Sequence, residues 1–200
     1  MTLVRIECVK PLIFLLSPAN CSGRRADLLF NPPTEFHLAR VLREKGAPLG
    51  EVFSFLSGLY FRGKLTYARA FARPPVGNSG IWVITAGRGL VEADTIVRLA
   101  DLESFRGVPI DEHEPRYREP LLRDGLALSK QLGPHGRAVL LGSIATTKYT
   151  SILHETLGDR LLFPQAFVGR GDFFRGGLLL RCVDEGRELD YSPICTPTRT

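Results

Sequence analysis

The sequence predicts a single α/β domain with a mostly parallel sheet of four to five strands and helices on both faces. Short aliphatic runs alternate with segments of helical pattern, which is typical of parallel strands joined by crossover helices. The chain has 200 residues, of which 44% are hydrophobic, and this suffices for one substantial core but not for two. We therefore assign residues 1–191 to one domain and predict a flexible tail over 192–200.

The predicted strands are aliphatic runs that end abruptly at turn-forming residues. The first, residues 12–16, has five apolar residues without alternation and stops at Ser17 and Pro18, as expected of a strand buried on both faces. The other predicted strands are residues 81–86, 138–141 and 160–163, with an edge strand at 188–191.

Helical patterns fill most of the chain between these strands. Apolar spacing, capping residues and stops at Gly or Pro set their limits. The predicted helices are residues 24–30, 34–45, 48–56, 59–73, 114–132 and 147–157, the last of these starting at 146 or 147, and a final helix that includes 178–183. Residues 91–110 show little pattern, so they form either a functional loop or a helix that the pattern does not reveal.

The helix predicted over 59–73 has the clearest amphipathic pattern. Its apolar positions recur at helical spacing and are Phe61, Leu65, Ala68 and Ala72. A second stripe, displaced by one residue, carries Arg62, Arg69 and Arg73. These three guanidinium groups could follow a phosphate backbone, or they could simply form the solvated face of a surface helix.

Charge is unevenly distributed along the chain. The net charge is +5, and residues 1–80 contain eleven Lys and Arg against five Asp and Glu, whereas the remainder is close to neutral. A basic half is typical of a protein with a polyanionic partner such as nucleic acid. The same excess could also serve only to keep the surface solvated.

Several classes of protein are not expected. No apolar run has the length of a membrane span or a typical signal peptide, so we expect a cytoplasmic protein without a membrane partner. The four cysteines form no CxxC pair, which disfavours a zinc site and, in a reducing compartment, a disulfide framework. We predict neither a metal nor a cofactor.

Polar loops follow the predicted strands, and they should converge on one cationic pocket, because ligands of parallel α/β sheets bind beyond the carboxyl ends of the strands. In the first loop, Ser17, Arg24 and Arg25 are candidates to bind phosphate. Asn20 could orient a water or contact a base edge. Cys21 has no histidine partner in view, which favours an inert thiol over a nucleophile. Arg88 of the second loop is a further candidate to bind substrate.

The third loop combines a glycine with residues that can donate to phosphate oxygens. Its candidate ligands are Ser143, Thr146, Thr147 and Lys148. The spacing of an ATP-binding P-loop is absent, which disfavours ATP hydrolysis. Thr146 or Thr147 could instead only cap the following helix.

The fourth loop, residues 169–177, places aromatic and cationic side chains on a glycine-rich backbone. Arg170, Phe173 and Phe174 are candidates to stack on a nucleobase, although either phenylalanine could instead be buried as a core anchor. Asp172 and Asp94 are the loop carboxylates best suited to general-base chemistry.

Two segments at the ends of predicted strands resemble those of a known group of α/β domains. The segments SPANC and IWVITAGRGLVEADT are similar to those of uracil-DNA-glycosylase-like α/β domains, a group that includes the related domain of archaeosine synthase. This resemblance implies a parallel-sheet domain that acts on a nucleobase, often within a nucleic acid. The glycosylase motifs GxDPY and HPSPLS are absent, as is a counterpart of the lysine-bearing loop of archaeosine synthase, so uracil excision is not implied.

Two functions remain open from the sequence. The first is an enzyme of nucleobase or N-glycosidic chemistry, in which Asn20, Asp94 or Asp172 takes part in catalysis and the loop cations and aromatics bind the substrate. The second is a non-catalytic nucleic-acid-binding module that uses the arginine stripe. An enzyme that acts on free nucleotides is a third possibility.

Overall fold

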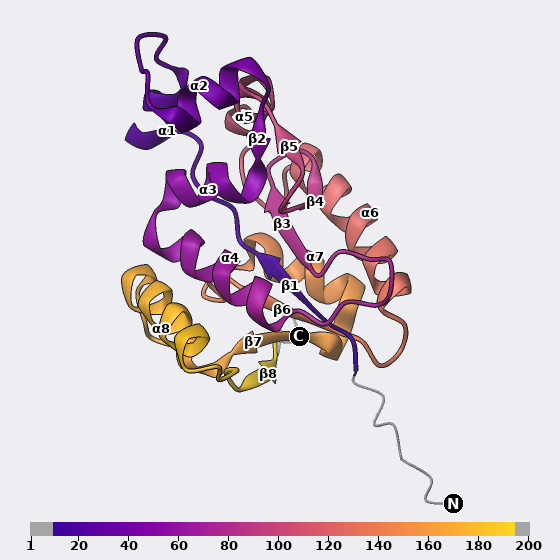
Figure 1. Cartoon of the computed structure of the whole chain (residues 1–200). Coiled ribbons are helices and arrows are strands. Elements are labelled where there is room, and N and C mark those ends of the chain that lie inside the picture. The colour runs from indigo at the N-terminus through magenta and orange to yellow at the C-terminus, as the bar shows by residue number, and fades with distance from the viewer. Residues whose placement is uncertain (1–9, 195–200) are drawn as a thin grey trace, which may run out of the picture.

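A six-stranded sheet runs through the molecule and carries helices on both faces (Figure 1). The computed structural model describes residues 10–194. In spatial order the strands are β4 (Gly89–Glu92), β3 (Ile81–Thr85), β1 (Leu12–Leu16), β6 (Arg137–Leu141), β7 (Leu161–Pro164) and β8 (Tyr191–Pro193). The four inner strands are parallel and the two edge strands antiparallel. The predicted α/β class with a mostly parallel sheet is therefore confirmed.

Strand β1 lies at the centre of this sheet, between β3 and β6. All five of its residues are buried, because alternate side chains enter the two hydrophobic cores on opposite faces. Phe14 and Leu16 join one core, whereas Ile13 and Leu15 join the other. The unbroken aliphatic run in the sequence is the consequence of this two-sided burial.

The helices divide between the two cores. Helices on the first face are α1 (Arg24–Phe30), α2 (His37–Glu44), α3 (Leu49–Ser57), α4 (Leu59–Phe71), α5 (Leu99–Arg106) and α8 (Asp172–Asp184). Those on the second face are α6 (Pro115–Leu132) and α7 (Thr147–Leu157). The connections that leave β1 and β6 thus run over opposite faces. No helix in residues 10–194 combines the length and the apolar character that a membrane crossing requires.

The structure resolves the segment that lacked a clear pattern. A tight hairpin joins β3 to β4, and its Gly87 and Gly89 have φ values of 84° and 66°, which favour glycine. A short antiparallel pair of β2 (Ala47–Pro48) and β5 (Ile96–Val97) then precedes α5. Residues 91–110 therefore contain two short strands and a helix, whose lengths are too small for a periodic signal.

Two predicted boundaries near the end of the chain were wrong. Helix α8 begins at Asp172, so Asp172, Phe173 and Phe174 belong to its first turn rather than to a loop. The edge strand is Tyr191–Pro193 instead of 188–191, which places part of the predicted tail in the sheet. The remainder of that tail, 195–200, lies outside the described residues.

Helices α4 and α8 pack closely, with one glycine from each at the contact. A Cβ on Gly63 would lie 2.7 Å from the carbonyl oxygen of Gly176, and a Cβ on Gly176 would lie 2.9 Å from the carbonyl oxygen of Leu59. The two backbones can approach this closely only because both positions lack a side chain. The contact holds the start of α8 beside the middle of α4.

Candidate functional site

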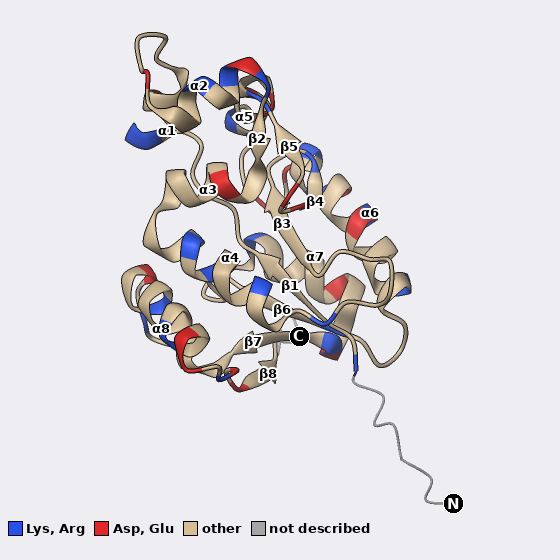
Figure 2. Cartoon of the chain, in the orientation of Figure 1, with Lys and Arg blue, Asp and Glu red and all other residues tan. Residues whose placement is uncertain are grey.

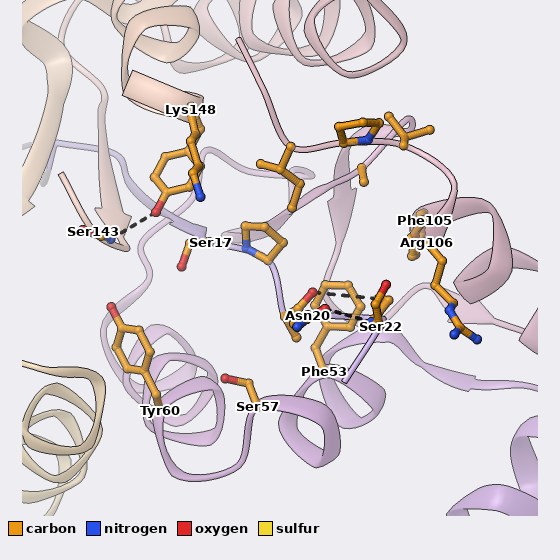
Figure 3. Close-up of a pocket in the computed structure, with 18 of the residues that line it drawn as sticks. Ser17, Asn20, Ser22, Phe53, Ser57, Tyr60, Phe105, Arg106, Ser143 and Lys148 are labelled. Atoms are coloured by element: carbon orange, nitrogen blue, oxygen red, sulfur yellow. Dashed lines mark hydrogen bonds between the residues drawn. The ribbon is translucent and has the colours of Figure 1, made fainter. Parts of the chain in front are cut away.

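A pocket of about 680 Å³ lies beyond the carboxyl ends of β1, β3 and β6 (Figure 3). It occupies the point at which the connections from β1 and β6 diverge to opposite faces, where ligands of open α/β sheets bind. Its lining comes from the loop after β1, from α3, α4 and α5, and from the starts of α7 and α8. Segments distant in sequence therefore meet at one site.

Three of the four predicted loops contribute to this pocket. The predicted site residues that line it are Ser17, Asn20, Ser143, Thr146, Lys148 and Asp172. Asn20 accepts a hydrogen bond from the Ser22 amide at 2.8 Å, which stabilises the turn after β1. Thr146 occupies the N-cap position of α7, but its side chain makes no capping hydrogen bond.

Lys64 on α4 is the most unusual residue of the pocket, and the sequence analysis did not select it. Its side chain is only 1% exposed. The ammonium group donates to the backbone carbonyl of Ser17 at 2.7 Å and contacts the Ser17 hydroxyl at 2.9 Å. It also lies 4.5 Å from the ring centre of Tyr60 and 4.6 Å from that of Phe61, distances at which a cation interacts with an aromatic face.

Burial lowers the pKa of Lys64 to about 7. Desolvation is the largest cause, because removing an ammonium group from water disfavours its charged form. Asp172 opposes this effect and Arg175 adds to it. The charge of Lys64 therefore changes close to neutral pH.

A signal for Lys64 was present in the sequence. It follows Phe61 by three residues and precedes Leu65, so it lies on the apolar stripe of the helix rather than on the arginine stripe. A lysine on a face expected to be buried requires a partner. The sequence could not show that this partner is Ser17.

Tyr149 of α7 closes the same end of the pocket. Its hydroxyl accepts a hydrogen bond from the Ser143 amide at 3.2 Å. Burial raises the pKa of Tyr149, while the hydrogen bonds from Ser143 and from the Ser17 hydroxyl oppose the rise. A Cβ on Gly142 would lie 2.8 Å from Cβ of Ser17 and 3.2 Å from the Tyr149 oxygen, so only glycine leaves room for this arrangement.

Tyr60 contributes a polar group that remains unsatisfied. The residue is 7% exposed, and its hydroxyl oxygen is buried without a geometric hydrogen-bond partner among the described residues. Burial raises the pKa of Tyr60, although the nearby Arg175 opposes this. The neutral Tyr60 hydroxyl is thus sealed from solvent beside Arg175.

Aromatic and apolar side chains form the opposite part of the wall. Phe53 and Phe105 meet edge to face with ring centres 6.2 Å apart. Arg106 lies at the edge of the pocket, where its guanidinium group packs 4.7 Å from the ring centre of Phe30. The pocket wall thus includes aromatic residues, which are themselves largely buried, and Arg106 stands at its edge.

Cys21 lines the pocket but is not an activated nucleophile. The residue is 7% exposed, and its thiol points to the carbonyl of Ala19 at 3.8 Å. Burial raises the pKa of Cys21 to about 11, with Arg106 opposing the rise. A thiol with this pKa remains protonated at neutral pH.

Other predicted loop residues lie outside the pocket lining. Arg25 donates to the carbonyl of Phe55 at 3.1 Å, and Arg24 is exposed on α1. Arg88 pairs with Asp101 at 2.6 Å. Thr147 hydrogen-bonds Glu112.

Asp94 lies at the opposite edge of the sheet. Because the hairpin reverses the chain, β4 pairs Glu92 with Trp82 and carries Asp94 back toward the start of β3. Its carboxylate pairs with Arg69 at 2.7 Å and is 74% exposed. The sequence analysis placed Asp94 near the other loops because the sequence does not reveal that β4 is antiparallel to β3.

The first turn of α8 presents its aromatic residues to solvent. Phe173 is 83% exposed and Phe174 39%, so neither is a buried core anchor. The Arg170 guanidinium lies 4.5 Å from the ring centre of Phe174. Of these neighbours, Asp172 is the one that lines the pocket.

Basic residues do recur along α4, as Figure 2 shows. Arg69 pairs with Asp94, and Arg73 forms a two-pronged ion pair with Glu188 at 2.9 and 3.1 Å. Arg62 is exposed. The predicted arginine stripe therefore has two of its three charges partly neutralised by neighbouring carboxylates.

Within residues 10–194, no group of three or more His, Cys, Asp and Glu side chains is placed to hold a metal ion. The described cysteines, Cys21 and Cys182, are free thiols. No protein-family model, curated protein or solved structure matches this chain.

Proposed function

We propose that this pocket binds and processes a nucleobase or nucleotide. The observation that supports this proposal is the combination, in one cavity, of an aromatic wall with cations on its rim. The largely buried Phe53, Tyr60 and Phe105 supply the aromatic part of the wall, while Arg106 and Lys148 offer positive charge. A planar base packs well against aromatic rings, and a phosphate is attracted to the cations. The volume of about 680 Å³ falls within the range of roughly 300–1,000 Å³ of small-molecule sites.

Polar groups in the wall could provide specificity. The buried Tyr60 hydroxyl lacks a partner, and the exposed Asn20 side chain has an amide that could contact a base edge. A site of this kind rejects ligands that leave its buried polar groups unpaired. The resemblance to nucleobase-processing domains is consistent with the same ligand class.

The arginine stripe of α4 offers weaker support for the alternative, a non-catalytic nucleic-acid-binding module. Its Arg69 and Arg73 already pair with carboxylates, and a phosphate would have to displace them. Arg106 also faces two carboxylates, but at the longer distances of 3.7 Å to Asp27 and 3.8 Å to Glu103. With the exposed Lys148 beside the same cavity, we prefer the pocket cations as candidates for ligand binding.

The test is a binding titration with free bases, nucleosides, nucleoside monophosphates and short oligonucleotides, followed by calorimetry. We expect at least one of these ligands to bind, and we expect Arg106→Gln and Lys148→Gln to weaken a phosphate-bearing ligand by about tenfold each. Arg62→Gln is the matched control, since it removes an exposed arginine outside the pocket. Absence of binding by every ligand, or equal losses in the control, would overturn the proposal.

A further inference from the structure

Ser17 and Lys64 form a buried polar pair at the base of the pocket. Their side-chain oxygen and nitrogen are 2.9 Å apart, although 47 residues separate them in the sequence. Ser17 is 7% exposed and Lys64 1%, and both residues contribute to the pocket lining. Figure 3 shows Ser17 between the segment that bears Ser143 and the one that bears Tyr60.

The pair is held rigidly on both sides. Lys64 also donates to the Ser17 carbonyl at 2.7 Å, and its ammonium group packs against the rings of Tyr60 and Phe61. Ser17 in turn donates its backbone amide to the carbonyl of Leu141 at 3.2 Å, which fixes it to the end of β6. The hydroxyl therefore occupies a defined position relative to the amine.

Charged and titratable groups reach this pair from several elements. Tyr60 belongs to α4 itself, Tyr149 comes from α7, and Asp172 and Arg175 come from α8. Both tyrosines have a raised pKa and remain neutral. Burial, aided by Arg175 and opposed by Asp172, brings the pKa of Lys64 to about 7, so a substantial fraction is the free amine at neutral pH.

We propose that Ser17 is a nucleophile for which Lys64 is the general base, and that the pocket transfers the acyl group of a carboxylic ester or similarly activated acyl compound. A serine hydroxyl is weakly nucleophilic by itself and requires a base within hydrogen-bond reach. Ser-Lys pairs perform this role in acyl transfer on several unrelated folds. The inference goes beyond base or nucleotide binding and does not depend on it.

The chemical step balances without any redox partner. Once Lys64 is neutral, the Ser17 hydroxyl turns its proton from Tyr149 to the Lys64 nitrogen, which accepts it as Oγ forms a bond to the acyl carbon. The bond to the leaving oxygen then breaks, and that oxygen takes the proton from Lys64. Water, deprotonated by Lys64, then attacks the acyl-serine. The bond between the acyl carbon and Oγ breaks, the carboxylic acid leaves, and Oγ takes the proton back from Lys64, which restores both side chains.

The pocket also offers groups that could stabilise the negative oxygen of the intermediate. Helices α7 and α8 both begin at its edge, where Thr146 and Asp172 line it. Neither helix has a side-chain cap at its amino end, but the first turn of α8 already carries the Asp172 carboxylate, so the α7 end is the better candidate. Backbone amides at such ends favour a developing negative charge.

The test uses p-nitrophenyl acetate with the full chain, and follows nitrophenol release together with peptide mapping of the acetylated residue. We expect acetyl transfer to Ser17, with a rate that rises as Lys64 loses its proton, around pH 7. Ser17→Ala and Lys64→Met should each lower the rate at least a hundredfold. Ser57→Ala is the matched control, because Ser57 lines the same pocket without belonging to the proposed pair.

Circular dichroism establishes that each variant is folded, and Ser17→Cys provides a second variant that retains a nucleophile and should still be acetylated. Lack of acetyl-Ser17 in the folded wild-type protein, or an unchanged rate in Lys64→Met, would overturn the inference. Titration of the nucleotide panel against Ser17→Ala separates the two proposals. Binding without acetylation contradicts only the nucleophile, and acetylation without binding contradicts only the nucleotide pocket.

Discussion

At the scale of single residues, the pocket depends on one lysine in a position where lysine is costly. Lys64 is almost completely buried, and its partners are neutral groups of Ser17 rather than a carboxylate in direct contact. An ammonium group so placed loses its hydration, for which two hydrogen bonds and two aromatic rings compensate only in part. Its lowered pKa expresses the remaining cost.

This cost makes the stability of the protein depend on pH. In the unfolded chain Lys64 has a pKa near 10.5, whereas the folded value is about 7. Between these values the unfolded state binds more protons, so the contribution of Lys64 to folding becomes more favourable as pH rises from 7 toward 10.5. Below that range the full penalty is present, and it is about 5 kcal/mol.

Urea unfolding of wild type and Lys64→Met across this range measures the effect. We expect the wild type to become more stable relative to Lys64→Met as the pH rises from 7 toward 10.5. Lys148→Met, which alters an exposed lysine of the same pocket, should instead follow the wild-type pH dependence. A constant difference between wild type and Lys64→Met would contradict this account of the buried amine.

At the scale of elements, the pocket depends on the close packing of α4 against α8. The first helix carries Lys64 and the second begins with Asp172, and the glycine contact holds them together. Gly63 and Gly176 thus have a role that their poor helix propensity alone would not suggest. Any side chain at this contact must separate the two backbones.

Alanine substitutions test the glycine contact. We expect Gly63→Ala and Gly176→Ala each to lower the free energy of unfolding by about 1–3 kcal/mol, because the new methyl group overlaps backbone atoms. Gly177→Ala is the matched control on α8: its Cβ would meet only the Arg181 guanidinium, at an ordinary 3.5 Å. That variant should be neutral or more stable by roughly 0.5–1 kcal/mol. Equal effects at all three positions, measured by thermal unfolding, would refute a special contact.

At the scale of the whole molecule, two basic regions are candidates for the proposed binding surface. The pocket rim carries Arg106 and Lys148, whereas α4 carries the partly paired arginine stripe. A pocket holds one nucleotide unit, while a helix face that follows a phosphate backbone would contact several. The dependence of affinity on ligand length therefore separates the two regions.

Fluorescence anisotropy with oligonucleotides of increasing length measures this dependence. If the pocket dominates, affinity should reach a plateau after the first few nucleotides, and the triple variant Arg62→Gln/Arg69→Gln/Arg73→Gln should retain both the affinity and its salt dependence. Affinity that grows steadily with length and falls in the triple variant would favour the helix-based module instead.

The sequence by itself determined the class of fold and the approximate location of the pocket. Short aliphatic runs can be recognised as buried strands because burial on both faces excludes polar residues from them. The polar loops after β1 and β6 can be recognised because they begin where these runs end. Five of the predicted residues of these two loops line the pocket, namely Ser17, Asn20, Ser143, Thr146 and Lys148.

Only the tertiary structure decided which side chains meet. The pairing of Lys64 with Ser17 joins residues 47 positions apart, and the antiparallel course of β4 takes Asp94 away from the pocket. Ion pairs with Asp94 and Glu188 likewise engage two arginines that appear free along the helix. Local patterns record the burial of each segment, but contacts between distant segments depend on strand order and helix packing, which no local pattern encodes.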